Sequence, residues 1–248
     1  RVPPPASFTS THDEPLPPAG GLPFGAAACS VAEHGPAHRI PLSRVGGGFG
    51  IVGVDYASSD GTAAAGSDYT AVSGSLSLAD GVLSKTFAVA ITDDVIYEGN
   101  ESLTLALSNP TGGAGLGSPT TASLTINEND PVPPSGSLQF STPSYSINEN
   151  GVSATITVTR VGGSFGIVGV DYASSDGTAA AGSDYTAVSG SLSLADGVLS
   201  KTFTVAITDD ATYEGNESLT LALSNPTGGA GLGTPVSASL TITEDDPI

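Results

Sequence analysis

The sequence matches itself almost without change when it is displaced by 116 residues. The stretch from Phe49 to Gly117 aligns with the stretch from Phe165 to Gly233 without a gap. The only pairs that differ are Ala88/Thr204, Val95/Ala211 and Ile96/Thr212. A fixed period at this identity indicates a tandem duplication, so one fold must be built twice. Because each copy has about 110 residues, each can bury a core of its own.

The same displacement defines the predicted domain organisation. Pro-rich stretches near residues 15 and 131 align with each other, and we interpret both as linkers. Residues before the first linker align with the end of a repeat, so we expect the sequence to be part of a longer array. A disordered Pro-rich tail is the open alternative for this segment. The predicted segments are 1–14 (last strand of a preceding repeat, disordered without its parent domain), 15–21 (linker), 22–130 (repeat 1), 131–137 (linker) and 138–246 (repeat 2).

Short runs of alternating apolar and polar residues fill repeat 2, and turns rich in Gly, Asp, Asn and Pro separate them. A period of two indicates strands with one buried face. We expect strands at 137–147, 153–161, 167–174, 188–194, 199–208, 217–224 and 235–243. The predicted fold is all-β, with two tandem seven-stranded antiparallel immunoglobulin-like β-sandwiches joined by a short Pro-rich linker. The first strands of repeat 1 are less regular, because Pro36 and Pro41 lack the N–H donor that a paired strand uses.

The charge of the chain restricts its partners. It has 6 Lys and Arg against 25 Asp and Glu, a formal net charge of -19. This balance disfavours nucleic acid and anionic membrane surfaces. Cys29 is the only cysteine, which leaves no intrachain disulfide, and repeat 2 contains no His or Cys to bind zinc. No apolar run approaches the length of a membrane span.

Carboxylates gather in one connection of each repeat, ITDDVIYEGNE from Ile91 to Glu101 and ITDDATYEGNE from Ile207 to Glu217. Neither loop contains Lys or Arg. If successive strands run up and down the sandwich, the first, third and fifth connections share one end with the exit of the last strand. Ten of the twelve acids of repeat 2 then converge at that end. Such a concentration of charge is either solvated or neutralised by a hard cation, and calcium takes six to eight oxygen ligands.

These motifs together resemble the Calx-beta domain. They are an acid after the first strand (EHG, NENG), then DGTAAAGSDY, then ITDDVIYEGNE or ITDDATYEGNE, and finally LTINENDP or LTITEDDP. The family occurs as tandem calcium-sensing domains in sodium/calcium exchangers, in integrin β4 and in large extracellular bacterial proteins. The resemblance implies Ca²⁺ as the bound ion. It implies calcium ligands at Glu33, Asp68, Asp93, Asp94, Glu98, Glu101, Glu128 and Asp130 in repeat 1, and at Glu149, Asp184, Asp209, Asp210, Glu214, Glu217, Asp245 and Asp246 in repeat 2.

Two departures from the family pattern bear on the number of ions and their affinity. The exchanger-type loop has a third acid where this chain has Val95 or Ala211, and Asn129 interrupts the final acidic run of repeat 1.

Three functions compete on this basis. The first is a non-enzymatic, calcium-rigidified spacer or adhesion stalk in a larger secreted or cell-surface protein, because stalks lengthen by duplication. Its expected partners are calcium ions, neighbouring repeats of the same chain, and other cell-surface proteins or glycans. The second is a calcium-sensing domain pair that regulates a membrane protein in cell communication. The third, a glycosidase with paired carboxylates, is disfavoured, since the same acids recur in duplicate without a conspicuous aromatic platform for sugar.

Overall fold

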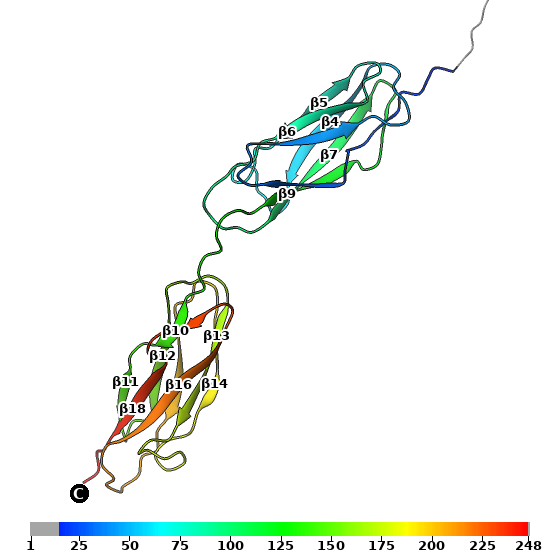
Figure 1. Cartoon of the computed structure of the whole chain (residues 1–248). Coiled ribbons are helices and arrows are strands. Elements are labelled where there is room, and N and C mark those ends of the chain that lie inside the picture. The colour runs from blue at the N-terminus through cyan, green and yellow to red at the C-terminus, as the bar shows by residue number, and fades with distance from the viewer. Residues whose placement is uncertain (1–14, 248) are drawn as a thin grey trace, which may run out of the picture. The chain divides into compact units, whose positions relative to one another are not determined.

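A computed structural model describes residues 15–247 of the chain. The chain divides into two compact units, the first ending at Pro131 and the second beginning at Val132 (Figure 1). Each unit is a β-sandwich, and every regular element among the described residues is a strand. The predicted all-β class with two tandem sandwiches is therefore confirmed. The orphan strand expected over 1–14 lies outside the described residues. No helix within 15–247 is long and apolar enough to cross a membrane.

Unit 2 shows the sandwich in its more regular form. Its strands are β10 (Ser137–Phe140), β11 (Ser144–Asn148), β12 (Ser153–Val161), β13 (Val168–Ser175), β14 (Ser189–Leu194), β15 (Ser200–Ala206), β16 (Glu217–Thr227), β17 (Gly231–Leu232) and β18 (Ser237–Thr243). One sheet has the order β15-β12-β10-β17 and the other the order β11-β18-β16-β13-β14. Most neighbours are antiparallel, whereas β11 pairs parallel with β18 and β10 parallel with β17.

The single strand predicted over 137–147 is wrong, because this stretch forms two strands in different sheets. β10 pairs antiparallel with β12, and β11 pairs with β18 in the opposite sheet. Between them, Pro143 fixes the backbone φ angle and carries no N–H, so a continuous ladder is interrupted there. The chain uses the interruption to cross from one sheet to the other.

Unit 1 repeats this arrangement with a weaker second sheet. Its strands are β1 (Gly21–Leu22), β2 (Ala28–Ala32), β3 (His38–Ser43), β4 (Val52–Asp60), β5 (Ser73–Leu78), β6 (Ser84–Val89), β7 (Glu101–Thr111), β8 (Gly115–Leu116) and β9 (Thr121–Asn127). The five-stranded sheet β2-β9-β7-β4-β5 is complete, but the other sheet is divided into the pairs β3-β6 and β1-β8. Pro23 and Pro41 stand where unit 2 has Gln139 and Thr157. Both prolines remove ladder donors, so only isolated bridges connect the two pairs.

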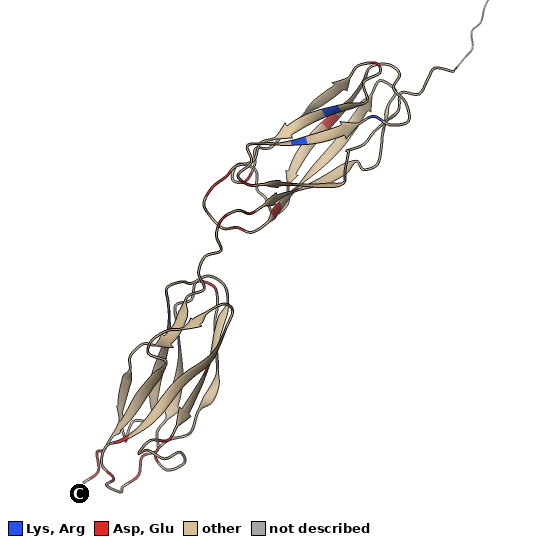
Figure 2. Ribbon diagram, viewed as in Figure 1, with Lys and Arg blue, Asp and Glu red and all other residues tan. Residues whose placement is uncertain are grey.

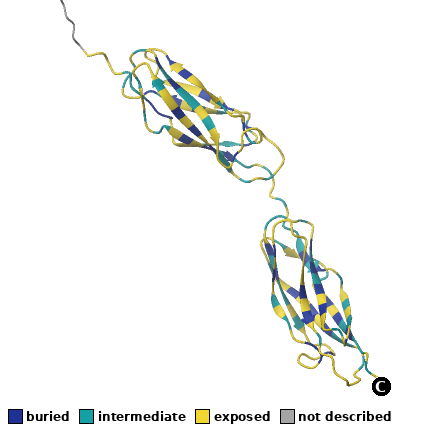
Figure 3. Ribbon diagram, turned by 180° about the vertical axis from the view of Figure 1, so that it is seen from behind, coloured by how far each residue is buried: buried dark blue, intermediate teal, exposed yellow. Residues whose placement is uncertain are grey.

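The core of each unit is the apolar layer between its sheets. In β12, the side chains of Ala154, Ile156 and Val158 are buried, and the residues between them are more exposed (Figure 3). Tyr172 in β13 is half-buried, and its ring stacks on that of Phe203 with centroids 4.0 Å apart. The alternation of apolar and polar residues thus corresponds to the buried and exposed faces of β12.

A buried arginine fastens the loops at the end of unit 2 opposite the clustered acids. Arg160 is 3% exposed, and its guanidinium donates hydrogen bonds to backbone carbonyl oxygens. Its Nε donates to Ser135 O at 2.7 Å, its Nη1 donates to Gly166 O at 3.0 Å, and its Nη2 donates to Phe165 O. Arg44 occupies the same place in unit 1, where Nε donates to the carbonyl of Ala19 at 2.6 Å. The guanidinium thus attaches the segment before the first strand to the body of its own unit.

Most Asp and Glu residues lie in loops at one end of each unit (Figure 2). In unit 2 this end receives the β11–β12, β13–β14 and β15–β16 connections and the exit of β18. We call it the acidic pole. In unit 1 the acidic pole is formed by the corresponding connections and the exit of β9.

Candidate metal centre

The connection between β13 and β14 is built around a buried tyrosine. Tyr185 is 1% exposed, and its hydroxyl donates to Asp176 Oδ1 at 2.7 Å. The same oxygen accepts the N–H of Ala181 at 3.0 Å, so Asp176 stabilises the turn. The neighbouring Asp184 accepts the N–H of Ala180 through Oδ2 at 2.6 Å. These contacts fix the backbone next to Asp184 and place its carboxylate at the acidic pole.

The acidic loop between β15 and β16 is shaped by local hydrogen bonds. Asp210 Oδ1 accepts the N–H of Thr212 at 2.6 Å, which closes a tight turn. Gly215 then adopts a φ of 79°, a conformation that a side chain rarely tolerates. β16 begins at Glu217, so this carboxylate lies at the end of a strand, on the rim of the sandwich.

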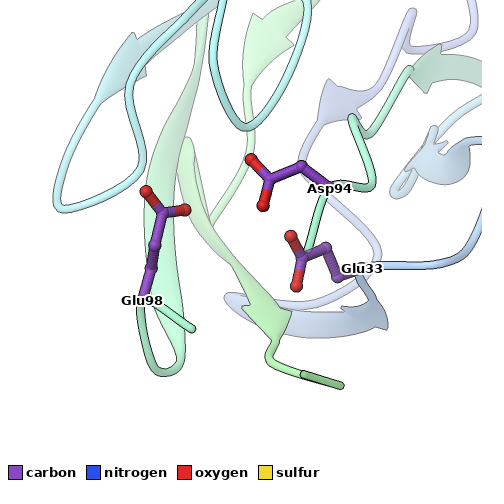
Figure 4. Close-up of side chains that lie close together, drawn as sticks. All are labelled: Glu33, Asp94 and Glu98. Atoms are coloured by element: carbon purple, nitrogen blue, oxygen red, sulfur yellow. The ribbon is translucent and has the colours of Figure 1, made fainter. Parts of the chain in front are cut away.

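In the described part of the chain, five groups of three carboxylates each offer oxygen atoms within 4.8 Å of one another. In unit 1 they are Glu33/Asp94/Glu98, Glu33/Glu128/Asp130 and Asp68/Glu98/Glu101; in unit 2 they are Glu149/Asp210/Asp246 and Asp184/Glu214/Glu217. Figure 4 shows the first of these, with the carboxylates of Glu33 and Asp94 beside each other and that of Glu98 directed toward them. Because neighbouring groups share residues in unit 1, the acids form a continuous cluster.

Burial and repulsion between neighbouring charges raise the pKa values of several of these acids. Glu149 is 8% exposed, and its pKa is raised to about 7, first by burial and then by the charge of Glu244. The pKa of Glu217 is also raised to about 7, by burial and by a hydrogen bond with Asp184. In unit 1 the pKa values of Glu33 and Glu101 are raised to about 7, with burial again the largest cause.

Within residues 15–247, one carboxylate oxygen in each unit is buried without a hydrogen-bond partner. These atoms are Asp130 Oδ2 and Asp246 Oδ2, which occupy equivalent places after the last strand. A buried acceptor without a donor is costly, and a bound cation is one of the few groups that can satisfy it.

The structure brings most of the predicted ligands together. Three of them, Asp93, Asp209 and Asp245, belong to none of the five groups. Asp245 is exposed, and its carboxylate accepts hydrogen bonds from the backbone and side chain of Asn150. In unit 1, Asn129 occupies the place of Asp245 and accepts the backbone N–H of His34 at 3.1 Å. Asn129 interrupts the acidic run of unit 1, but its side chain still accepts a hydrogen bond from the turn after β2. The contact is therefore preserved although an amide replaces the acid.

The sequence-based ligand set omits Glu244, which lines the same hollow as Glu149, Asp184, Glu214 and Glu217. The displacement of 116 residues aligns Glu244 with Glu128, which is in the set. Comparing the two lists position by position would therefore have identified it.

The donor atoms fit calcium better than other common metals. Every group in the described part of the chain consists of carboxylate oxygens, with no His or Cys among them. Calcium prefers six to eight oxygen ligands and tolerates irregular geometry, whereas zinc favours nitrogen and sulfur. The partnerless oxygens of Asp130 and Asp246 and the raised acid pKa values also favour a divalent cation at each pole.

The fold and the paired acidic poles define a tandem β-sandwich protein with an all-oxygen candidate metal centre in each unit. The sequence profile of the Calx-beta domain matches residues 20–130 and 134–246. The chain therefore belongs to the Calx-beta family.

Several known proteins are similar to this chain. Adhesion G-protein coupled receptor V1 of Danio rerio is 34% identical over 213 residues, which cover 82% of the chain and 3% of the receptor. Sodium/calcium exchanger 1 of Canis lupus familiaris is 32% identical over 206 residues, 75% of the chain and 21% of the exchanger. The crystal structure of the calcium binding domain CBD12 of CALX1.1 is matched over 88% of this chain and 98% of that chain, with 23% identity and a TM-score of 0.43. The chain thus spans only a small part of these two curated relatives.

Proposed function

We propose that each unit binds calcium ions at its acidic pole, and that the chain is a non-enzymatic, calcium-stabilised structural module of a larger secreted or cell-surface protein. The observation that carries the proposal is the partnerless buried oxygen of Asp130 and of Asp246. Burial and the charges of neighbouring acids raise the pKa of both aspartates. A divalent cation removes both penalties at once.

The proposed ligands are the carboxylates in the five groups apart from that of Glu128, whose oxygens accept backbone N–H groups. In unit 1 they are Asp68, Glu98 and Glu101 together with Glu33, Asp94 and Asp130. In unit 2 the corresponding sets are Asp184, Glu214 and Glu217, and Glu149, Asp210 and Asp246. We propose Asp93, Asp209 and Asp245 as further ligands at the same poles. When calcium is bound it supplies positive charge, and the side chains of the chain hold it and close the pole.

Calcium titration of the whole chain tests the proposal. Isothermal titration calorimetry at moderate salt is expected to show saturable binding, and the melting temperature is expected to rise with free calcium, because the ion binds only the folded state. The control is the double variant Asp80→Asn and Asp196→Asn, which removes two charges away from the acidic poles. Asp80 accepts the backbone N–H of Gly50, and Asp196 accepts that of Gly166. This variant should bind calcium as the unaltered chain does. Absence of both heat and thermal shift at millimolar calcium would show that the poles are solvated rather than metal-binding.

A regulatory calcium-sensing pair is the second candidate function, favoured by the similarity to sodium/calcium exchanger 1. The affinity distinguishes the two functions. Cytosolic calcium sensors bind with dissociation constants of about 10⁻⁷–10⁻⁵ M, and extracellular modules with about 10⁻⁴–10⁻³ M. The near-identity of the two repeats favours the structural module, with neighbouring repeats and other surface proteins or glycans as its partners. A sub-micromolar constant in the same titration would favour the sensor.

A further inference from the structure

One carboxylate at the pole of unit 2 is surrounded by backbone N–H groups. Glu244 Oε2 accepts the N–H of Glu214 at 2.7 Å and of Gly215 at 2.9 Å. Its Oε1 accepts the N–H of Asp245 at 3.1 Å and of Asp246 at 2.9 Å. A single side chain therefore joins the acidic loop between β15 and β16 to the exit of β18.

Unit 1 reproduces the arrangement with a different neighbouring residue. Glu128 Oε2 accepts the N–H of Glu98 at 2.6 Å and of Gly99 at 2.9 Å. Its Oε1 accepts the N–H of Asn129 at 2.9 Å and of Asp130 at 2.8 Å. The four contacts persist although unit 2 has Asp245 in place of Asn129, so they do not depend on the charge at that position.

The backbone of this glutamate is itself anchored. Asn216 Oδ1 accepts the N–H of Glu244 at 3.1 Å, and Asn100 Oδ1 accepts the N–H of Glu128 at 3.0 Å. Each asparagine directly precedes the glutamate that opens the next strand. The contact between the loop and the strand exit is therefore made twice, by the side chain of the glutamate and by its main chain.

The hydrogen bonds use the acceptor capacity of the glutamate. An ionised carboxylate has about four lone-pair sites, and four N–H groups occupy them. The same donors lower the pKa of Glu244 and of Glu128 to about 2, with the backbone N–H of Asp246 or Asp130 as the largest cause. The charge is thus held by the protein itself, whereas burial raises the pKa values of Glu33 and Glu149 beside it.

We propose that Glu128 and Glu244 are positioning residues, which tie the acidic loop to the strand exit and arrange the metal ligands before calcium arrives. This inference rests on the proposed function, in that the residues so arranged are the proposed ligands Glu98, Asp130, Glu214 and Asp246. Although Glu128 belongs to one of the five carboxylate groups, both of its oxygens already accept hydrogen bonds from backbone N–H groups. Holding the loop in place lowers the ordering entropy that calcium binding must overcome.

The double variant Glu128→Gln with Glu244→Gln tests the role. Glutamine keeps the length of the side chain, but its amide nitrogen can only donate and cannot face two N–H groups. In chelator, hydrogen exchange of the Glu98, Gly99, Glu214 and Gly215 amides should accelerate by about tenfold or more. Calcium affinity should fall by a similar factor, while the number of ions per chain stays the same. At saturating calcium the loop amides should regain protection, because the ligands then close the loop.

The matched control is Glu101→Gln with Glu217→Gln, which changes proposed ligands at the start of β7 and β16 and leaves the carboxylates of Glu128 and Glu244 in place. Here affinity or stoichiometry should fall, with loop exchange in chelator unchanged. Mass spectrometry can follow the two loops separately, since Val95 and Ile96 replace Ala211 and Thr212. The positioning role is overturned if the Glu128/Glu244 variant keeps normal loop exchange in chelator but binds fewer ions.

A second variant covers the case in which the double variant does not fold. Glu244→Asp keeps the charge but is one methylene shorter, so it should lose the contacts to Glu214 and Gly215. Fast exchange is then expected in the loop of unit 2 alone, with unit 1 as an internal reference. Unchanged exchange in that loop would contradict the proposal. If the unaltered chain binds no calcium, the proposed function fails, while the exchange comparison in chelator still decides whether this glutamate holds the loop.

Discussion

Replacing the buried glutamate of each pole by glutamine should stabilise the calcium-free chain and weaken calcium binding. The change is Glu33→Gln together with Glu149→Gln. Glu149 has an ordinary pKa of 4.5 that is raised to about 7 in the folded unit, first by burial and then by the charge of Glu244. Because the folded-state pKa lies above the unfolded one, the contribution of this group to stability is present below pH about 4.5. It is lost as the pH rises through about 7.

The size of the effect follows from the shift. A change of about 2.5 pKa units corresponds to at most about 3.4 kcal/mol, and solvent screening at a loop-lined pole reduces it to about 1–2 kcal/mol for each unit. For domains of this size, that is a rise of about 4–10 °C in the melting temperature at pH 8. Glutamine removes the charge and can donate a hydrogen bond to the carboxylates around it.

Differential scanning calorimetry in chelator at pH 5, 6, 7 and 8 measures this. The unaltered chain should lose stability between pH 5 and 8, and the variant should lose less. The pair Asp80→Asn and Asp196→Asn, with the same change in charge away from the poles, should keep the pH dependence of the unaltered chain. Equal melting curves for the variant and the unaltered chain across this range would refute the assignment of the repulsion to Glu33 and Glu149.

Other parts of the structure give further predictions. Arg160→Met should lower the free energy of unfolding of unit 2 by about 2–4 kcal/mol in denaturant titrations, because buried carbonyls lose their donors, and calcium affinity should not change. Tyr185→Phe removes the hydroxyl that donates to Asp176 and should cost about 1 kcal/mol in the same assay. In chelator, raising the salt concentration from about 0.01 M to about 1 M should raise the melting temperature, since the Debye length falls from about 30 Å to about 3 Å. With saturating calcium the salt effect should be much smaller.

The strands could be predicted largely because their residues alternate with a period of two. The stretch 153–161 matches β12 residue for residue, and its apolar members are buried. Alternation does not reveal which sheet a strand joins, however. The segments on either side of Pro143 therefore read as one strand, although they pair with β12 and β18 in opposite sheets.

The convergence of acids at one end could be predicted, because alternate connections between up-and-down strands lie at the same end. The contacts that each acid makes could not be predicted. Asp245 and Glu244 are adjacent acids. Asp245 accepts hydrogen bonds from Asn150, however, whereas Glu244 accepts hydrogen bonds from four backbone N–H groups. Such contacts depend on side-chain directions set by packing between segments about 30 to 95 residues apart. The role of Asp93, Asp209 and the other acids as metal ligands remains a prediction.

The arginine that binds the carbonyl of Ser135 has a consequence for cutting and joining repeats. A fragment that begins at β10 would discard one of the buried acceptors of Arg160, together with Pro134, whose carbonyl accepts the N–H of Phe165 at 3.3 Å. Recombinant pieces and grafted repeats should therefore start at Pro134, or at Pro18 for unit 1, where the carbonyl accepts the N–H of Phe49 at 3.4 Å. A natural duplication that copied such a repeat without these few preceding residues would produce a sandwich that lacks these hydrogen bonds at the end opposite the acidic pole.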